Sequence, residues 1–259
     1  MSVQIPTELI ELWDGLADYP ASRTDQSLGY LLHTVSDWIQ ADKAYWVGAI
    51  RMRTNRKDSI DGWRPRAMIY MNADQRNKAL YDYAMKALDA GVPAETIKHH
   101  VKNAGKFRVY TKLEIASEDY LNSDYHRNKQ KIQYESDVLY VVAPINRDAE
   151  AYFVFSRADG RFSEQDQATA VAAFQGLKWF FRRLMLHHGL MLADTPLTST
   201  ERLVLSHLVT DLSEKQIAEK LNKKSDVTHQ HVKSIYRKFN VNSRAALMAI
   251  WLGVVPEAK

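Results

Sequence analysis

Short helices capped one after another dominate residues 198–252, and this pattern constrains the fold more than any other in the sequence. Thr198 and Glu201 form a capping box, in which each side chain satisfies a backbone amide of the other. Ser213 and Gln216 form a second box, and Ser243 marks a further helix start. Apolar residues follow each start at helical spacing. The segment therefore predicts a small all-helical domain built from four helices joined by tight turns.

The third of these helices is expected over residues 225–239, with different chemistry on its two sides. Its inward positions would be Thr228, Val232, Ile235 and Phe239. The outward positions carry donors and amides rather than carboxylates, as contacts with phosphates and base edges require. A helix of this kind fits the major groove of DNA, and the arrangement favours a helix-turn-helix domain. Those outward residues are His229, Gln230, Lys233, Ser234 and Arg237.

Without a gap, residues 197–252 resemble the C-terminal DNA-binding domain of LuxR/FixJ/GerE-type transcription regulators. Lys224 stands where the family has serine, and Val227-Thr228-His229 stands where it has Thr-Val-Lys. The residues that carry the resemblance are Leu197-Thr198, Glu201, Leu205, Leu212-Ser213, Lys215, Ile217-Ala218, Leu221, His231, Ile235-Tyr236, Lys238, Val241, Ser243-Arg244 and Leu247.

The resemblance implies a regulator that binds double-stranded DNA, with RNA polymerase as a candidate partner. It implies that His229 and Lys233 face bases. Lys215, His231 and Arg237 would lie near the DNA backbone, as would Lys238. The full predicted DNA-contacting set is Lys215, Lys224, Ser225, His229, Gln230, His231, Lys233, Ser234, Arg237 and Lys238.

Upstream, the sequence predicts a mixed α/β domain with one central sheet. Strands are expected at 44–52, 66–71, 107–113, 138–145 and 151–156, the last two joined by a five-residue turn. Helices are expected at 5–16, 25–39, 73–90 and 94–103. The pattern resembles GAF/PAS-like sensor domains with α-β-α layering. We expect this domain over residues 1–192, a linker over 193–196 and the DNA-binding domain over 197–259.

Aromatic residues on these strands are candidates to line a pocket for a small apolar or amphipathic ligand, although aromatic residues also favour strands as ordinary core. The candidates are Trp46, Trp63, Tyr70, Tyr110, Tyr140 and Phe153. Quorum-sensing relatives with an autoinducer-binding domain carry a Trp and a Tyr four apart and an Asp-Pro pair. Here Ala67 stands four residues after Trp63 and the chain has no Asp-Pro, so an acyl-homoserine lactone is disfavoured. Two alternatives stay open: a ligand-free domain that only dimerises or docks a protein, and an enzyme.

A long helix is expected to start after Ser163 and to run toward residue 192, with apolar residues on more than one side. That surplus predicts a homodimer, with Phe180 and Leu184 as exposed positions in the contact.

Several classes of chemistry find no support. The 259 residues include no cysteine, and no apolar run reaches membrane-spanning length. Adjacent histidines, such as His187 and His188, point apart on a helix, so no metal site is expected. No catalytic constellation is present, so we expect no enzymatic activity and no cofactor. Net charge is +4, concentrated after residue 194, and we expect a cytoplasmic protein.

Overall fold

The computed structural model describes residues 5–51, 58, 60–72, 82–83, 86, 95–133, 135–191 and 197–252. Most of the expected 73–90 helix and the whole 193–196 linker lie outside these residues. By contact density the chain separates into two units. The first comprises Met1–Trp13 and Gly29–Lys178, and the second comprises Asp14–Leu28 and Trp179–Lys259. The expected domain boundary at residue 192 stays a prediction.

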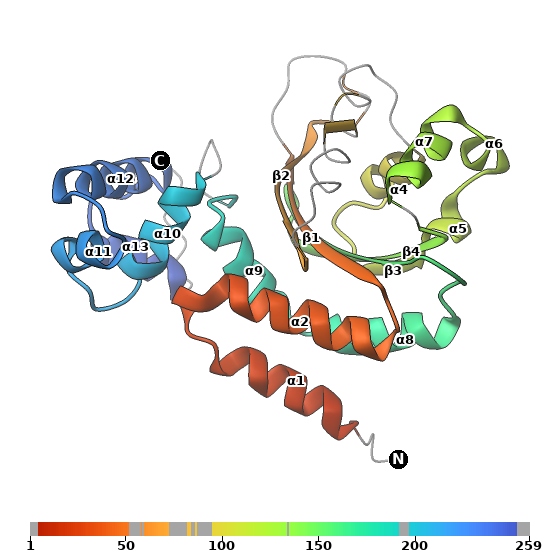
Figure 1. Cartoon of the computed structure of the whole chain (residues 1–259), viewed down its shortest axis with the longest axis horizontal. Coiled ribbons are helices and arrows are strands. Elements are labelled where there is room, and N and C mark those ends of the chain that lie inside the picture. Colours follow the sequence, from red (N-terminus) through yellow and green to blue (C-terminus); the bar gives the residue numbers. More distant parts are fainter. Residues whose placement is uncertain are drawn as a thin grey trace. The chain divides into compact units, whose positions relative to one another are not determined.

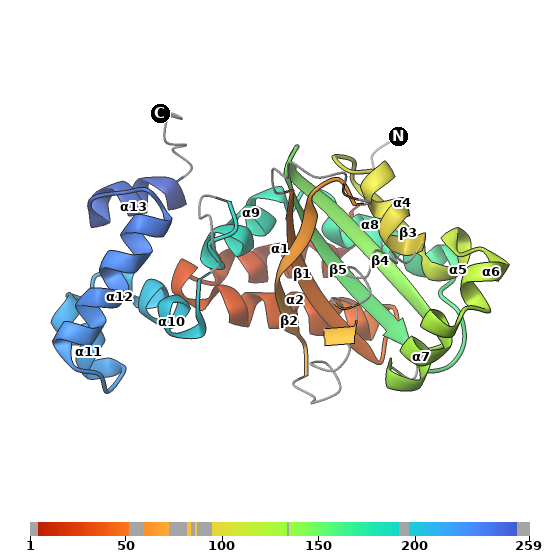
Figure 2. The ribbon, with the colours of Figure 1, turned by 90° about the horizontal axis from the view of Figure 1, so that it is seen from above.

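An antiparallel five-stranded sheet forms the centre of the first unit, in the order β2-β1-β5-β4-β3 (Figures 1 and 2). The mixed α/β class expected from the sequence is confirmed. Each predicted strand is present. Its β-branched and aromatic residues favour extended backbone. The strand pairs with one neighbour at the edge of the sheet or with two inside it. The strands are β1 (Lys43–Arg51), β2 (Trp63–Tyr70), β3 (Arg108–Thr111), β4 (Asp137–Asn146) and β5 (Ala149–Arg157).

The turn between β4 and β5 is shorter than expected. The two strands pair as far as Asn146 opposite Ala149, which leaves two residues in the turn instead of five. The Asn146 side chain accepts a hydrogen bond from the backbone N–H of Asp148 at 2.8 Å, and this bond fixes the turn locally.

Helices lie on both sides of this sheet (Figure 1). On one side, α8 packs Phe174 against Phe153 of β5, with ring centroids 4.7 Å apart, and accepts a hydrogen bond from Trp13 of α1 at the Ala173 carbonyl. On the other side, helices α4 to α7 follow one another, and of these only α4 corresponds to an expected helix. The helices with residues in the first unit are α1 (Thr7–Asp18), α2 (Thr24–Trp38), α4 (Glu95–Lys102), α5 (Lys112–Ile115), α6 (Glu118–Leu121), α7 (Asp124–Gln133) and α8 (Glu164–Phe174). The next helix, α9 (Lys178–His187), belongs to the second unit from Trp179 on.

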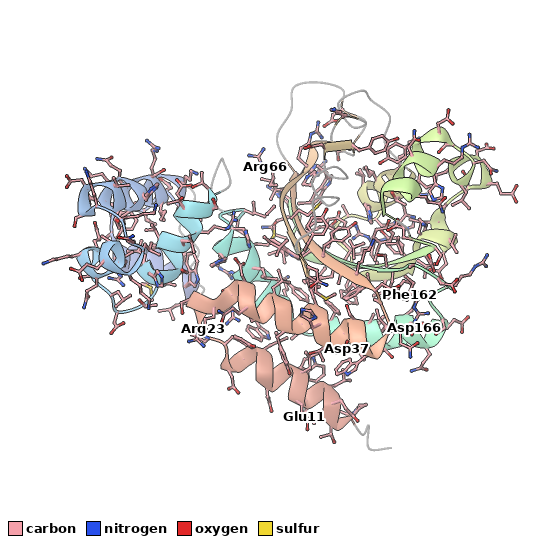
Figure 3. The ribbon with its side chains drawn as sticks, viewed as in Figure 1. Glu11, Arg23, Asp37, Arg66, Phe162 and Asp166 are labelled. Atoms are coloured by element: carbon pink, nitrogen blue, oxygen red, sulfur yellow. The ribbon has the colours of Figure 1, made fainter. Side chains whose placement is uncertain are left out.

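The start of α8 is set by local hydrogen bonds, as expected. Ser163 and Asp166 form a capping box, and Arg157 of β5 reaches the Asp166 carboxylate at 3.1 Å. The Arg157 guanidinium also stacks over the Phe162 ring. Phe162 and Asp166 are labelled next to each other in Figure 3. These contacts attach the beginning of α8 to the end of β5.

The single long helix expected after Ser163 is wrong, because the chain breaks between α8 and α9. Gln175 leaves the helical region and Gly176 takes a φ of +95°, a conformation that side-chain-bearing residues rarely adopt. Beyond the break, Phe180 and Leu184 are both fully buried rather than exposed. Among the large apolar side chains of α9, only Trp179 is exposed. The apolar surplus on α9 is therefore mostly covered within the chain.

Four helices make up the C-terminal part of the second unit, as the sequence predicts. They are α10 (Ser199–Leu208), α11 (Glu214–Lys220), α12 (Ser225–Lys238) and α13 (Arg244–Trp251). Asn222 and Asn240 close the turns after α11 and α12 with positive φ, which asparagine tolerates better than most residues. The unit also contains the short helix η1 (Ala21–Arg23), which contacts α10. Across the described residues, no helix has the length and apolar character to cross a bilayer.

Two glycine substitutions should change stability in opposite directions. An added Cβ would meet nothing within 4 Å at Gly176 or at Gly29 within α2, so only the backbone conformation distinguishes them. Gly176→Ala should destabilise the protein by about 1–2 kcal/mol because of its positive φ. Gly29→Ala should stabilise it by about 0.5–1 kcal/mol because alanine favours the helix. Urea unfolding followed by circular dichroism measures both, and changes of the same sign would contradict the explanation.

Candidate nucleic-acid interface and tyrosine face

One side of α12 is exposed and carries several of the residues expected to contact DNA. His229, Gln230, Lys233 and Arg237 are all exposed on this helix. Lys215 of α11 is exposed too, as are Lys224, which precedes α12, and Ser225, the first residue of that helix. The exposed residues thus form a polar surface with an excess of cationic groups along the helix.

The opposite side of α12 is buried as expected. Val232 and Ile235 belong to the core that α12 shares with α10, α11 and α13. Thr228 is fully buried as well, and its hydroxyl has no hydrogen-bond partner among the described residues. A hydroxyl therefore occupies a core position where valine would fit without an unsatisfied polar group.

Glu201 attaches the start of α10 to the far half of α12. Its carboxylate accepts hydrogen bonds from the Lys238 ammonium at 2.7 Å and the Ser234 hydroxyl at 2.7 Å, and from the Thr198 amide at 2.7 Å. Burial alone would raise the pKa of Glu201, but the Lys238 ammonium and the other donors lower it to about 2. The structure thus gives Ser234 and Lys238, both expected to contact DNA, an internal role that sequence reasoning missed.

Two histidines of the expected DNA-contacting set differ in their surroundings. His229 lies 2.9 Å from the Glu214 carboxylate of α11, and both side chains are about half exposed. His231 is only half-buried and lies on a different side of the helix. At the start of α12, Lys224 occupies the N-cap position without a side-chain hydrogen bond, which is the consequence of lysine standing where the resembling family has serine.

The hydrogen bonds to the Glu201 carboxylate should stabilise the folded protein at neutral pH and should be lost in acid. A carboxylate whose pKa is lowered by folding stabilises the folded state above its unfolded pKa of about 4.3, and loses that contribution as the pH falls toward 2. Unfolding of the full chain at pH 6 and pH 3 should show this loss, and Glu201→Gln should reduce the difference by about 1 kcal/mol after allowance for solvent screening. Glu219→Gln, on an exposed residue of α11, should leave the difference unchanged. An equal effect of both substitutions would contradict the prediction.

In the first unit, tyrosines form a row across one face of the sheet. The strand registers place Tyr110 opposite Tyr140, Tyr140 opposite Val154, Val154 opposite Tyr45, and Tyr45 opposite Tyr70. Directly paired residues point to the same side of a sheet. We call this side the tyrosine face, defined by Tyr45, Tyr70, Tyr110, Tyr140 and Tyr152.

The six aromatic residues expected to line one pocket divide between the two faces. Tyr70, Tyr110 and Tyr140 lie on the tyrosine face, and Trp63 is on the same side because it pairs with Arg51, which shares the alternation of Tyr45. Trp46 pairs with Phe153 on the opposite face, where Phe153 contacts Phe174 of α8. Both are fully buried. The six candidates therefore do not share one face of the sheet, and Trp46 and Phe153 are core residues on the side of α8. A ligand-lining role for the others stays a prediction.

A buried ion pair adjoins the tyrosine face, and the sequence analysis did not anticipate it. Glu150 of β5 is fully buried and accepts both guanidinium N–H groups of Arg108, at 2.9 and 3.0 Å. It also accepts the Tyr152 hydroxyl at 2.6 Å and the Gly105 amide at 2.8 Å. Burial alone would lower the pKa of Arg108, but Glu150 raises it. The alternation of β5 was the available signal, because it places Glu150 on the same side as Tyr152.

His100 of α4 joins these tyrosines from the helical side. Its ring packs edge-on to Tyr140 at 5.2 Å and to Tyr152 at 4.9 Å, and its Nδ1 is hydrogen-bonded to the Tyr110 hydroxyl. Burial raises the pKa of Tyr110 and Tyr140, so both hydroxyls stay protonated at neutral pH. The tyrosine face therefore combines apolar rings with neutral hydroxyl groups.

Comparison with known proteins gives one family match. Residues 195–251 match the family described as bacterial regulatory proteins, luxR family. No curated protein matches the chain significantly.

Solved structures that match include SdiA in complex with octanoyl-rac-glycerol, with a TM-score of 0.45 at 12% identity, covering 95% of this chain and 95% of that one. The VqsR LBD domain from Pseudomonas aeruginosa matches with 0.45 at 11% identity, covering 70% of this chain and 95% of that one. Escherichia coli SdiA in space group P6522 matches with 0.44 at 13% identity, covering 97% and 99%.

Proposed function

Because residues 195–251 are a DNA-binding domain of the luxR family of bacterial regulatory proteins, we propose that this chain regulates transcription by reading a specific DNA site with α12. The observation that carries the proposal is the exposed side of α12, where Gln230, Lys233 and Arg237 follow one another and the two cations outnumber the single carboxylate, Asp226. Lysine, arginine and glutamine are the side chains best suited to hydrogen-bond base edges in the major groove.

Within this surface, different residues have different roles. Lys233 and His229 are proposed to face bases, whereas Lys215, Lys224 and Ser225 are proposed to contact the phosphate backbone. Ser234 and Lys238 are proposed to act through Glu201, by holding α12 in place. A homodimer would present two such helices to the half-sites of a near-palindromic operator. RNA polymerase remains a proposed partner.

Replacing Lys233 by alanine tests the base-reading role. Lys233→Ala should cost about 1–3 kcal/mol of specific DNA binding and relax discrimination at one base position. Lys215→Ala should weaken specific and random DNA about equally, and reduce the slope of log affinity against log salt by about one, because one fewer counterion is released. The operator is first selected from a random DNA library with the full chain, and affinities are then measured by fluorescence anisotropy.

The matched control is Lys98→Ala, which removes an exposed lysine from α4 in the other unit. This variant should bind DNA as the wild type does. If Lys233→Ala leaves discrimination between operator and random DNA unchanged, the assignment of Lys233 is wrong.

For the first unit, we propose that the tyrosine face binds a small amphipathic molecule other than an acyl-homoserine lactone. Support comes from the row of tyrosines, which combines aromatic surface with protonated hydroxyls, as ligand sites that fix orientation by a few polar groups do. The ligand would shift the population between states of the regulator that differ in DNA affinity.

Neighbouring residues on β2 offer a test, because Tyr70 lies on the tyrosine face and Ile69 lies on the other, and both are half-buried. Metabolites are screened by thermal shift on the full chain, where a ligand at 100 times its Kd stabilises the fold by about 2.7 kcal/mol. Tyr70→Ala should reduce the ligand-induced shift, whereas Ile69→Ala should preserve it. Equal losses in both variants would reject the tyrosine face. A screen without any stabilising compound would favour a domain that only dimerises or docks a protein.

A further inference from the structure

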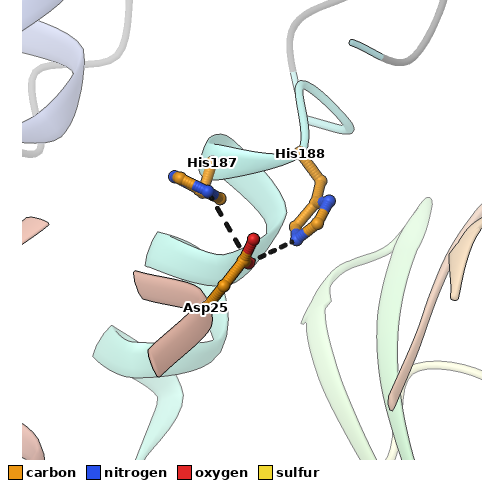
Figure 4. A group of neighbouring side chains, drawn as sticks. All are labelled: Asp25, His187 and His188. Carbon is orange, nitrogen blue, oxygen red and sulfur yellow. Dashed lines mark hydrogen bonds and ion pairs between the residues drawn. The ribbon is translucent and has the colours of Figure 1, made fainter. Parts of the chain in front are cut away.

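Three potential metal ligands from distant parts of the sequence converge in the second unit (Figure 4). Asp25 lies in the first turn of α2, and His187 and His188 lie at the end of α9. The His188 Nε2 atom is 3.1 Å from the Asp25 Oδ1 atom, and the His187 Nε2 atom is 3.6 Å from the same oxygen. One ligand atom from each of the three residues lies within 4.8 Å of the other two.

The end of α9 explains why two adjacent histidines converge, against the expectation that they point apart. Helix α9 ends at His187, and Gly189 takes a φ of +71°. The Leu190 amide then bonds the Met185 carbonyl at 2.8 Å and the Gly189 amide bonds the Leu186 carbonyl at 2.9 Å, as in a Schellman cap. His188 is thus the last residue before the chain reverses, and its ring, inclined by 77° to that of His187, turns toward Asp25.

The separations of the two histidine nitrogens from the Asp25 oxygen also suit a small divalent cation. A hydrogen bond accounts for His188 at 3.1 Å, but 3.6 Å is too long for a second one from His187. Around tetrahedral Zn²⁺, with ligands at about 2.0–2.1 Å, neighbouring ligand atoms lie about 3.3 Å apart. The separations of 3.1 and 3.6 Å bracket that value.

The surroundings also suit a bound cation. The two histidine side chains are 5% and 1% exposed, whereas Asp25 is 47% exposed, so the cluster is closed on the imidazole side and open to solvent at the carboxylate. An ion can enter on that side, and a water molecule can complete the coordination.

We propose that Asp25, His187 and His188 form a binding site for a transition-metal ion of the Zn²⁺ type. Two imidazoles and one carboxylate are a common zinc ligand set that leaves a fourth position for water. Because three protein ligands are supplied by two separate helices, the ion cross-links the beginning of α2 to the end of α9.

The site adjoins the core of the DNA-binding helices. Leu186, one residue before His187, is part of that core together with Leu197, and the Leu197 amide bonds the His188 carbonyl at 3.3 Å. A metal ion that fixes His187 and His188 therefore stabilises the backbone on which the start of α10 is anchored. Metal binding should raise the melting temperature of the protein, because the ion binds the folded chain and not the unfolded one.

Zinc titration of the metal-free full chain tests the site. Isothermal titration calorimetry with ZnCl₂ should show one tight site per chain, and Asp25→Asn and His187→Gln should each weaken it by at least about 100-fold. Asp25→Asn keeps the side-chain shape at a half-exposed position, so the variant should fold, as circular dichroism of the metal-free protein verifies. The controls Asp37→Asn and His33→Gln alter exposed residues of α2, Asp37 being labelled in Figure 3, and should bind zinc as the wild type does.

Cobalt substitution gives a second readout that a purely structural role would not produce. Co²⁺ bound by the wild type should develop the visible d–d bands of a four-coordinate ion, and Asp25→Asn should abolish them. The proposal is overturned if the wild type takes up no zinc in equilibrium dialysis. It is equally overturned if Asp25→Asn and His187→Gln bind zinc as tightly as the two controls.

Discussion

The three hydrogen bonds that the Glu201 carboxylate accepts are the interaction on which the proposed DNA-binding surface depends. The carboxylate belongs to α10, yet Ser234 and Lys238, two of its donors, belong to α12. A buried carboxylate is stable only when its lone pairs are occupied, so the charge forces α12 into the one orientation that supplies those donors. That orientation leaves Lys233 and Arg237 facing solvent. The same residue that caps one helix thus sets which side of another is presented to a partner.

In the N-terminal sheet the comparable constraint is the two-residue alternation of the strands. It assigns Tyr110, Tyr140 and Tyr45 to one face and Trp46 and Phe153 to the other. The second face packs against Phe174 of α8. The first face has a buried apolar cluster of its own, which includes Tyr140 and Val154, and the burial of Glu150 there is balanced by Arg108. The sheet thus buries apolar side chains on both faces, and its buried ion pair lies on the face that carries the tyrosines.

Features set by interactions between residues close in sequence could be predicted, and features set by contacts between distant residues could not. The four C-terminal helices were predictable because capping boxes such as Thr198–Glu201 act over three residues and were read directly from the sequence. The break at Gly176 was missed because the helical apolar pattern continues across it, and the pattern does not report φ. The other features that were missed depend on residues distant in sequence. They are the burial of Phe180, the contact of Lys238 with Glu201 and the contact of Asp25 with His188. Periodicity carries no information about such pairs.

The place of Leu186 has a consequence for how such regulators are assembled from parts. This residue precedes the matched segment, 195–251, but its side chain is buried in the same core as Val204 and Phe239. A recombination event that joined this DNA-binding segment to a different N-terminal partner at residue 195 would leave that core with a hole the size of a leucine. The exchangeable unit therefore begins upstream, in the last turn of α9, and partners that lack an apolar side chain there would be poor recipients.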